Sequence, residues 1–329
     1  MTLWYITEIS WNGCAPSAVF DPWAVAQVRH ERARMTSDGV TISSALLSAE
    51  VSAQGAELQS LRTNNGRDLL WDGDPSFWTG RAPILFPVVG LLNGGHYHYD
   101  GRTYAMPKHG FARSTEFAVT EQSDTAVTMR LAATDATRAA YPFEFTLDLT
   151  FRLDGAILQV SAAIANHGDI PMPASFGFHP ALRWPLPFGA ERTAHRIAFD
   201  RDEPEAVRRI GPDGLLLPQS EPSPVVGREL ALRDDLFRAD ALIFDAVRSR
   251  SVNYGAPHQP QVRVTFSDFS LLGVWTKPGA GFICIEPWQG LPDPAGFSGD
   301  IRDKPGIMLI APGDTRRLAM AIAVTGSAE

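Results

Sequence analysis

The chain has 329 residues, of which 44% are hydrophobic and 20% are charged, a composition typical of a globular protein with a substantial core. Its net charge of −8 comes from interspersed acids and bases without a basic stripe or arm, so we expect no nucleic acid partner. Its apolar runs fall short of the ~20 residues that span a bilayer, so we expect no membrane partner either.

The N-terminal region differs from the rest of the chain. Residues 1–37 contain three tryptophans and a charged HERAR run but little periodicity, so we predict an extension, either peripheral or outside the translated protein. The cysteines, Cys14 and Cys284, exclude a disulfide framework and match no metal or redox spacing. With no signal-peptide pattern at the start of the chain, they favour a reducing compartment, the cytoplasm.

Short segments of alternating polarity, separated by turn residues, follow one another from residue 38 onward. The predicted strands, in chain order, lie in Gly39–Arg62, His96–Met106, Phe117–Asp135, Phe143–Gly168, Gln261–Lys277 and Gly281–Trp288. Asp-Gly pairs at 100–101 and 154–155 predict hairpin turns. We expect a closing hairpin at Met308–Gly326 and a long loop at Arg201–Arg228.

Few stretches support a long amphipathic helix, and the strand-like segments recur at roughly 8–12-residue spacing. Neither the expected loop at Pro185–Gly189 nor the one at Arg201–Arg228 shows a change of composition that would mark a domain boundary. We therefore predict an all-β protein in which residues 38–329 form one large antiparallel β-sandwich domain.

The SFGFHP segment places a histidine beside open space. In a strand, Ser175, Gly177 and His179 share one face, and the two phenylalanines anchor the other face in the core. Pro180 ends the pairing, which places His179 near a strand end. The alternative is a structural histidine at a strand edge.

The ICIEPWQG segment places a carboxylate in an apolar strand. Phe282, Cys284 and Glu286 share one face, Pro287 is expected to end the strand, and Trp288 could offer a flat face to a sugar. A buried carboxylate has a raised pKa, which suits a general base. The alternative is a structural salt bridge to an arginine.

The KHGFAR segment carries His109 before a glycine and Arg113 four positions later, which is either a site or a turn histidine with a solvated arginine. His96 and His98 alternate with tyrosines, and because no third ligand is evident we interpret them as a solvated strand face, not a metal site.

Read together in this order, RAPILFPVVG, KHGFAR, SFGFHP, ICIEPWQG and IAPGD resemble the aldose 1-epimerase (galactose mutarotase-like) family, in particular its bacterial subgroup with HGFxR and FGxHP motifs. The resemblance covers about residues 38–325. It implies a large antiparallel β-supersandwich with a sugar cleft, and an enzyme that interconverts α and β anomers without a metal or cofactor.

The resemblance also implies residue roles. His179 would donate a proton to the ring oxygen, Glu286 would take the proton of the C1 hydroxyl, and His109 would help to polarise the ring oxygen. Asp240 would bind a sugar hydroxyl, with Asp245 as an alternative. We expect His179 and Glu286 to face each other across a gap one pyranose wide.

One position departs from the family pattern. Relatives often carry an arginine where this chain has Leu91, so the sugar contact is absent or comes from Arg81 or Arg113. This leaves open a non-catalytic sugar-binding protein of the same fold. It also leaves open a hexose 6-phosphate mutarotase with a basic pocket from Arg81, Arg113, Arg302 or Lys304. The partner is in each case a small sugar, and the chain is expected to be a monomer or a homodimer.

Overall fold

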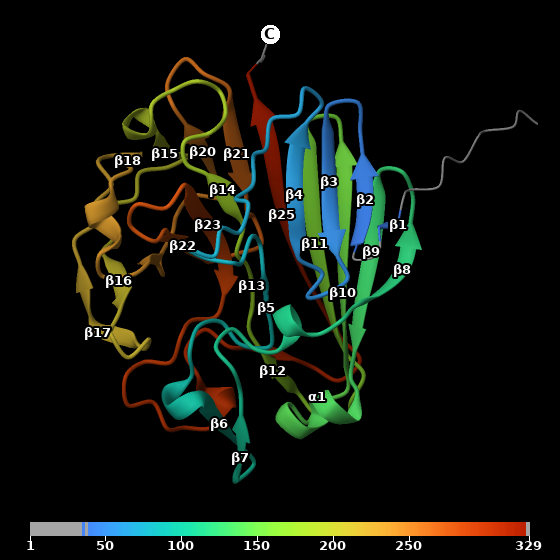
Figure 1. The fold of residues 1–329 in the computed structure, drawn as a ribbon. Coiled ribbons are helices and arrows are strands. Elements are labelled where there is room, and N and C mark those ends of the chain that lie inside the picture. The colour runs from blue at the N-terminus through green and yellow to red at the C-terminus, as the bar shows by residue number, and fades with distance from the viewer. Residues whose placement is uncertain (1–34, 37–38, 327–329) are drawn as a thin grey trace, which may run out of the picture. The chain divides into compact units, whose positions relative to one another are not determined.

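A computed structural model describes residues 35–36 and 39–326. The predicted extension therefore lies outside the described residues, apart from the strand β1 (Met35–Thr36). Within the described part, strand ladders are antiparallel and form five sheets (Figure 1). The all-β prediction is confirmed. No helix in this part is long and apolar enough to cross a membrane.

The largest sheet has nine strands and supplies one layer of the sandwich. Its strands, in spatial order, are β18 (Glu229–Ala231), β15 (Arg196–Phe199), β20 (Ser251–Gly255), β21 (Gln261–Thr265), β25 (Thr315–Thr325), β11 (Ile157–Asn166), β10 (Phe145–Asp154), β9 (Ala126–Ala132) and β8 (Ala118–Gln122). In β10, Leu147, Leu149 and Phe151 are buried and alternate with polar residues, the pattern of a sheet with one face on the core.

A four-stranded sheet covers part of this layer. It contains β1, β2 (Gly39–Ser43), β3 (Leu47–Ser52) and β4 (Leu58–Thr63), and β2 contacts β9 and β10. The predicted two or three strands between residues 39 and 62 are therefore three.

An eight-stranded sheet carries the residues that matter for the site. Its order is β17 (Leu216–Glu221), β16 (Val207–Ile210), β19 (Leu242–Phe244), β22 (Leu271–Trp275), β23 (Phe282–Gln289), β13 (Phe176–Phe178) and β5 (Ile84–Leu85), with β14 (Ala181–Arg183) also paired to β23. Its inner face contributes Phe176, Phe178, Ile283 and Ile285 to the same core as β10 and β2, so one apolar core joins the three large sheets.

Small elements complete the described region. Two-stranded sheets pair β12 (Met172–Ala174) with β24 (Met308–Ile310) and β6 (His96–Tyr99) with β7 (Arg102–Ala105). The 3-10 turns are η1 (Asn93–Gly95), η2 (Ala112–Ser114), η3 (Arg192–Ala194), η4 (Asp234–Phe237) and η5 (Ile301–Asp303).

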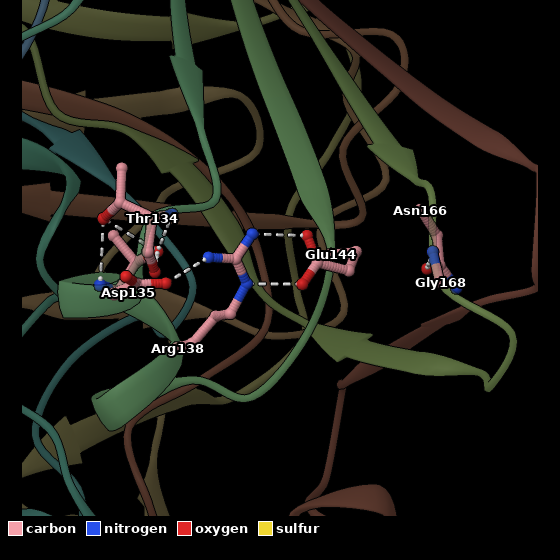
Figure 2. A network of polar contacts seen from close by, with 7 residues as sticks. Thr134, Asp135, Arg138, Glu144, Asn166 and Gly168 are labelled. Atoms are coloured by element: carbon pink, nitrogen blue, oxygen red, sulfur yellow. Dashed lines mark hydrogen bonds and ion pairs between the residues drawn. The ribbon is translucent and has the colours of Figure 1, made fainter.

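The one α-helix in the described residues, α1 (Asp135–Ala140), is stabilised at its first turn by a reciprocal capping box in which Thr134 and Thr137 bond each other's backbone N–H groups. Figure 2 shows the Arg138 guanidinium between the carboxylates of Asp135 and Glu144, which ties this helix to the start of β10.

Two predicted connections are wrong. The segment Met308–Gly326 is no hairpin, because β24 pairs with β12 whereas β25, the red strand in Figure 1, pairs with β11 and β21. The segment Arg201–Arg228 is not a long loop, since β16 and β17 pair within it. The hairpins at Asp100–Gly101 and Asp154–Gly155 are confirmed.

Candidate active site

Sheet register brings the predicted acid and base together. On β23, Trp288 pairs with Gly177 of β13, and Cys284 pairs with Ala181 of β14. The same register, continued through the interruption between β13 and β14, places His179 opposite Glu286. Opposite residues of an antiparallel pair project from the same face, with Cβ atoms about 4.5–5.5 Å apart. The backbone therefore holds the two side chains side by side.

The predicted faces of β23 are confirmed, but its predicted end is wrong. Ile283 and Ile285 lie in the main core, whereas Phe282 and Cys284 pack in a separate cluster on the outer face. The strand continues through Pro287 to Gln289. Pro287 is tolerated because it lies where β13 and β14 part, so its missing N–H removes no ladder bond on that side.

The His179 and Glu286 side chains are in direct contact. Nε2 of His179 lies 3.1 Å from Oε2 of Glu286, and the exposed fractions of the two residues are 7% and 1%. The expected gap one pyranose wide is therefore absent from this structure, because the contact leaves no space for a ring between the two groups.

Burial pushes both groups toward their neutral forms. It raises the pKa of Glu286 well above its usual value, and the charge of Asp240 acts in the same direction. Burial also lowers the pKa of His179, helped by the positive charge of Arg113. The Trp288 N–H lowers the pKa of Glu286 slightly, although it does not meet hydrogen-bond geometry.

His109 lies in a tight turn beside this pair. His109 and Gly110 both have positive φ, +68° and +75°, and a Cβ on Gly110 would lie 2.1 Å from the Phe86 carbonyl oxygen. Only glycine allows the backbone to approach so closely. The His109 ring lies edge-on to the His179 ring, with their centroids 5.8 Å apart.

The turn also selects the tautomer of His109. Its Nδ1 accepts a hydrogen bond from the Gly90 N–H at 3.1 Å, and burial lowers its pKa, so the ring is neutral and its Nε2 carries the proton. His109 is therefore a hydrogen-bond donor through Nε2.

A cavity of about 220 Å³ opens above the pair. Five of the six predicted site residues line it: His109, Arg113, His179, Asp240 and Glu286. Asp240 has a positive φ of 63° and accepts the N–H of Ala241 through Oδ1, which holds its carboxylate at the cavity edge.

Several lining residues were missed by the sequence analysis, among them Lys108, Trp78 and Trp275. Lys108 directly precedes His109 in the KHGFAR segment, and its positive charge beside a predicted site residue was the available indication. Trp78 lies in a loop without a local pattern, yet its ring packs 5.0 Å from that of His179 between centroids. Trp275 meets the same imidazole edge-on at 5.9 Å.

Arg81 does not line the cavity. Its guanidinium donates to the backbone carbonyl of Gln59, so it stabilises the neighbouring loop instead. Asp245 pairs with Arg208 at 3.4 Å and also lies outside the lining. Lys304, one of the cations expected in a phosphate-binding pocket, is buried in an ion pair with Asp293.

Arg302 pairs with Asp300 and packs over Tyr99, again away from the cavity. The Leu91 side chain packs against Gly214 and does not line the cavity. The departure from the family pattern at Leu91 is therefore not compensated by Arg81, and Arg113 is the arginine that this cavity offers.

Known proteins share this architecture. The family model described as Aldose 1-epimerase matches residues 38–203. Protein LacX of Lactococcus lactis subsp. lactis is 29% identical over 288 residues, which cover 84% of this chain and 96% of that protein. A galactose mutarotase related enzyme from Lactobacillus acidophilus superposes with a TM-score of 0.82 at 29% identity, covering 88% of this chain and 97% of that one.

A galactose mutarotase-like protein from Lactobacillus casei gives a TM-score of 0.81 at 31% identity, with 87% of this chain and 100% of that chain covered. The family match spans half of the chain, and the solved relatives are covered almost end to end. The chain therefore belongs to the aldose 1-epimerase family.

Proposed function

We propose that this chain interconverts the α and β anomers of an aldose by acid–base ring opening, with Glu286 as general base and His179 as general acid. The observation that carries the proposal is the contact of these two side chains, 3.1 Å apart, at the floor of a cavity. Each positioned proton transfer contributes about 10²–10⁴-fold to such a reaction.

The close contact matches the geometry of a hemiacetal. The C1 hydroxyl oxygen and the ring oxygen are bonded to the same carbon, so a base acting on one and an acid acting on the other must be neighbours. A sugar lying over the pair, with C1 above the space between Nε2 and Oε2, meets both groups at once. Rotation about the C1–C2 bond of the open-chain aldehyde then allows closure to the other anomer.

Burial of the pair acts on both ends of the ring-opening step. When Glu286 takes the hydroxyl proton and His179 gives its proton to the ring oxygen, a carboxylate and an imidazolium become a carboxylic acid and a neutral imidazole. The directions of the two pKa shifts favour these neutral products and disfavour the charged pair that starts the step, so the 3.1 Å contact between the two groups has to stabilise the charged pair. On ring closure the same protons return, so the pair is regenerated.

Neighbouring groups orient the sugar in this proposal. The Nε2–H of His109 donates to the ring oxygen or an adjacent hydroxyl, and the Asp240 carboxylate accepts from a hydroxyl. The Trp78 ring supplies an apolar wall and packs against His179 at an interplanar angle of 31°, which restrains the imidazole and keeps water from it.

A second candidate substrate, a phosphorylated or otherwise anionic sugar, is favoured by two cations. Lys108 and Arg113 line the cavity, and within residues 39–326 neither side chain has an ion-pair or hydrogen-bond partner. Uncommitted cations of this kind recognise phosphate or carboxylate oxygens. In this form of the proposal, Arg113 and Lys108 bind the anionic substituent while the acid and base remain the same.

Anomer exchange measured by NMR tests both forms. Glucose, galactose and their 6-phosphates are compared for wild type, Glu286→Gln and His179→Asn, and each variant should be slower by at least ~100-fold. His96→Asn and Glu121→Gln, which change the same residue types outside the cavity, serve as matched controls. Unchanged rates in folded Glu286→Gln would contradict the proposal, and sugar binding without any acceleration would identify a non-catalytic binding protein.

A further inference from the structure

Cys284 is a buried thiol next to the catalytic pair that the proposed reaction does not use. It lies two residues before Glu286 on the same face of β23 and has no exposed surface. It is a free cysteine, and in the described part of the chain its thiol has no hydrogen-bond partner. A thiol held this close to an imidazole and a carboxylate is a potential metal ligand.

The three side chains form a compact donor set. One ligand atom each from His179, Cys284 and Glu286 all lie within 4.8 Å of one another. Tetrahedral Zn²⁺ with one sulfur, one nitrogen and one oxygen ligand needs ligand–ligand separations of about 3.4–3.6 Å, so the most distant ligand atoms have to approach by at most about 1.2–1.4 Å.

The hydrogen bonding of Glu286 also points to a ligand. Oε2 of Glu286 is buried and has no partner with hydrogen-bond geometry, and it faces the other donors of the set. Buried polar atoms are normally satisfied, so a buried carboxylate oxygen whose contact with an imidazole lacks hydrogen-bond geometry, close to a thiol, indicates a position where a cation is bound.

We propose that His179, Cys284 and Glu286 bind a thiophilic divalent cation of the Zn²⁺ class at the floor of the cavity. A thiolate, a neutral imidazole and a carboxylate balance the two positive charges, so the buried complex is neutral. Three protein ligands leave a fourth position open toward the cavity, as in other mononuclear zinc sites. Hard cations such as Mg²⁺ and Ca²⁺ prefer all-oxygen ligands and are disfavoured here.

Binding of such a cation would inhibit anomer exchange, a consequence that rests on the proposed function. The cation engages the groups that act as acid and base, so sugar and metal compete for the cavity floor. Lys108 and Arg113 repel an entering cation but attract an anion, so the open position suits an anionic fourth ligand. The predicted inhibitor is therefore a metal together with a small anion.

Cobalt spectroscopy tests the binding without reference to activity. Co²⁺ titrated into the full chain should give a stoichiometric thiolate-to-cobalt charge-transfer band that Zn²⁺ abolishes. Cys284→Ala should remove this band and weaken Zn²⁺ binding by at least ~100-fold. Cys14→Ala changes the only other cysteine in the sequence and should leave the band intact.

Three results would overturn the proposal: a wild-type protein without the band, a band that survives in Cys284→Ala, or a band lost in Cys14→Ala. Should Cys284→Ala not fold, Glu286→Gln removes another ligand at constant volume and should weaken Zn²⁺ binding at least ~10-fold. Inhibition is measured separately, as the exchange rate with Zn²⁺ relative to the metal-free rate of the same variant. A chain that binds Co²⁺ through Cys284 but does not exchange anomers would refute the proposed function alone.

Discussion

Replacing Gly273 by alanine would place a methyl group against the indole beside the catalytic pair. Gly273 pairs with Glu286 across β22 and β23. A Cβ at this position would lie 2.8 Å from Cζ2 and 3.0 Å from Cη2 of Trp288. The indole lies close to a second glycine as well, because its Cδ1 lies 2.7 Å from the position that a Cβ on Gly177 would take.

Two opposing effects decide the sign of this change. Alanine in a strand is more stable than glycine by about 0.5–1 kcal/mol when space is available. An extra methyl group in a packed interior costs about 1–3 kcal/mol. We therefore expect a net loss of about 1–2 kcal/mol in the free energy of unfolding. This corresponds to a Tm lower by about 2–3 °C for a domain of this size.

Thermal and denaturant unfolding measure the effect, and anomer exchange reports whether displacement of Trp288 narrows the cavity and raises KM. Gly281→Ala is the matched control, because its added Cβ would meet nothing closer than 3.3 Å. In a double-mutant cycle, Trp288→Phe removes the indole atoms Cζ2 and Cη2 and should therefore reduce the loss of stability caused by Gly273→Ala. A Gly273→Ala protein as stable as wild type would refute this account of the packing.

Three further predictions concern charged groups. Burial lowers the pKa of His195, whose Nε2 accepts a backbone N–H. The contribution of this neutral ring to the free energy of unfolding is therefore fully present above pH ~6.5 and is lost as the pH falls below that value. Denaturant unfolding at pH 7 and pH 5 should show a shallower pH slope in His195→Gln, by at most about 1.4 kcal/mol per pH unit. Lys304→Met, which leaves Asp293 buried and unpaired, should cost about 3–5 kcal/mol in the same assay, and a loss below about 1 kcal/mol would contradict a desolvated ion pair. Arg113→Gln should lower kcat/KM by roughly 10–100-fold, whereas Arg81→Gln, outside the cavity, should change it less than about threefold; equal losses would contradict the placement of the two side chains.

The site was predictable where it depends on local backbone geometry. Alternation along a strand assigned Cys284 and Glu286 to one face and Ile283 and Ile285 to the other, because side chains in a strand point alternately to its two sides. For His109 the sequence left a site and a turn histidine as alternatives, and the structure shows a cavity-lining histidine in a turn of positive φ.

The errors have a common physical cause. The expected hairpin of Met308–Gly326 is wrong because adjacent strands need not pair, and β24 finds its partner more than 130 residues away in β12. Nothing in the sequence favoured Arg81 or Arg113 for the sugar contact, because both are arginines beside predicted site segments. The surrounding backbone decides which of the two side chains reaches the cavity. Trp78 was missed because its loop has no periodic pattern.

The sequence by itself determined the strands of its clearly alternating segments, such as Phe143–Gly168 and Gly281–Trp288, with their buried faces, the two Asp-Gly turns and the residue types available for acid–base chemistry. These follow from interactions between near neighbours in the chain. Tertiary structure decided that His179 stands opposite Glu286 in direct contact, that a thiol lies beside them, and that Lys108 and two tryptophans complete the cavity. Those outcomes depend on the register between strands about one hundred residues apart, which is set by the packing of the whole core.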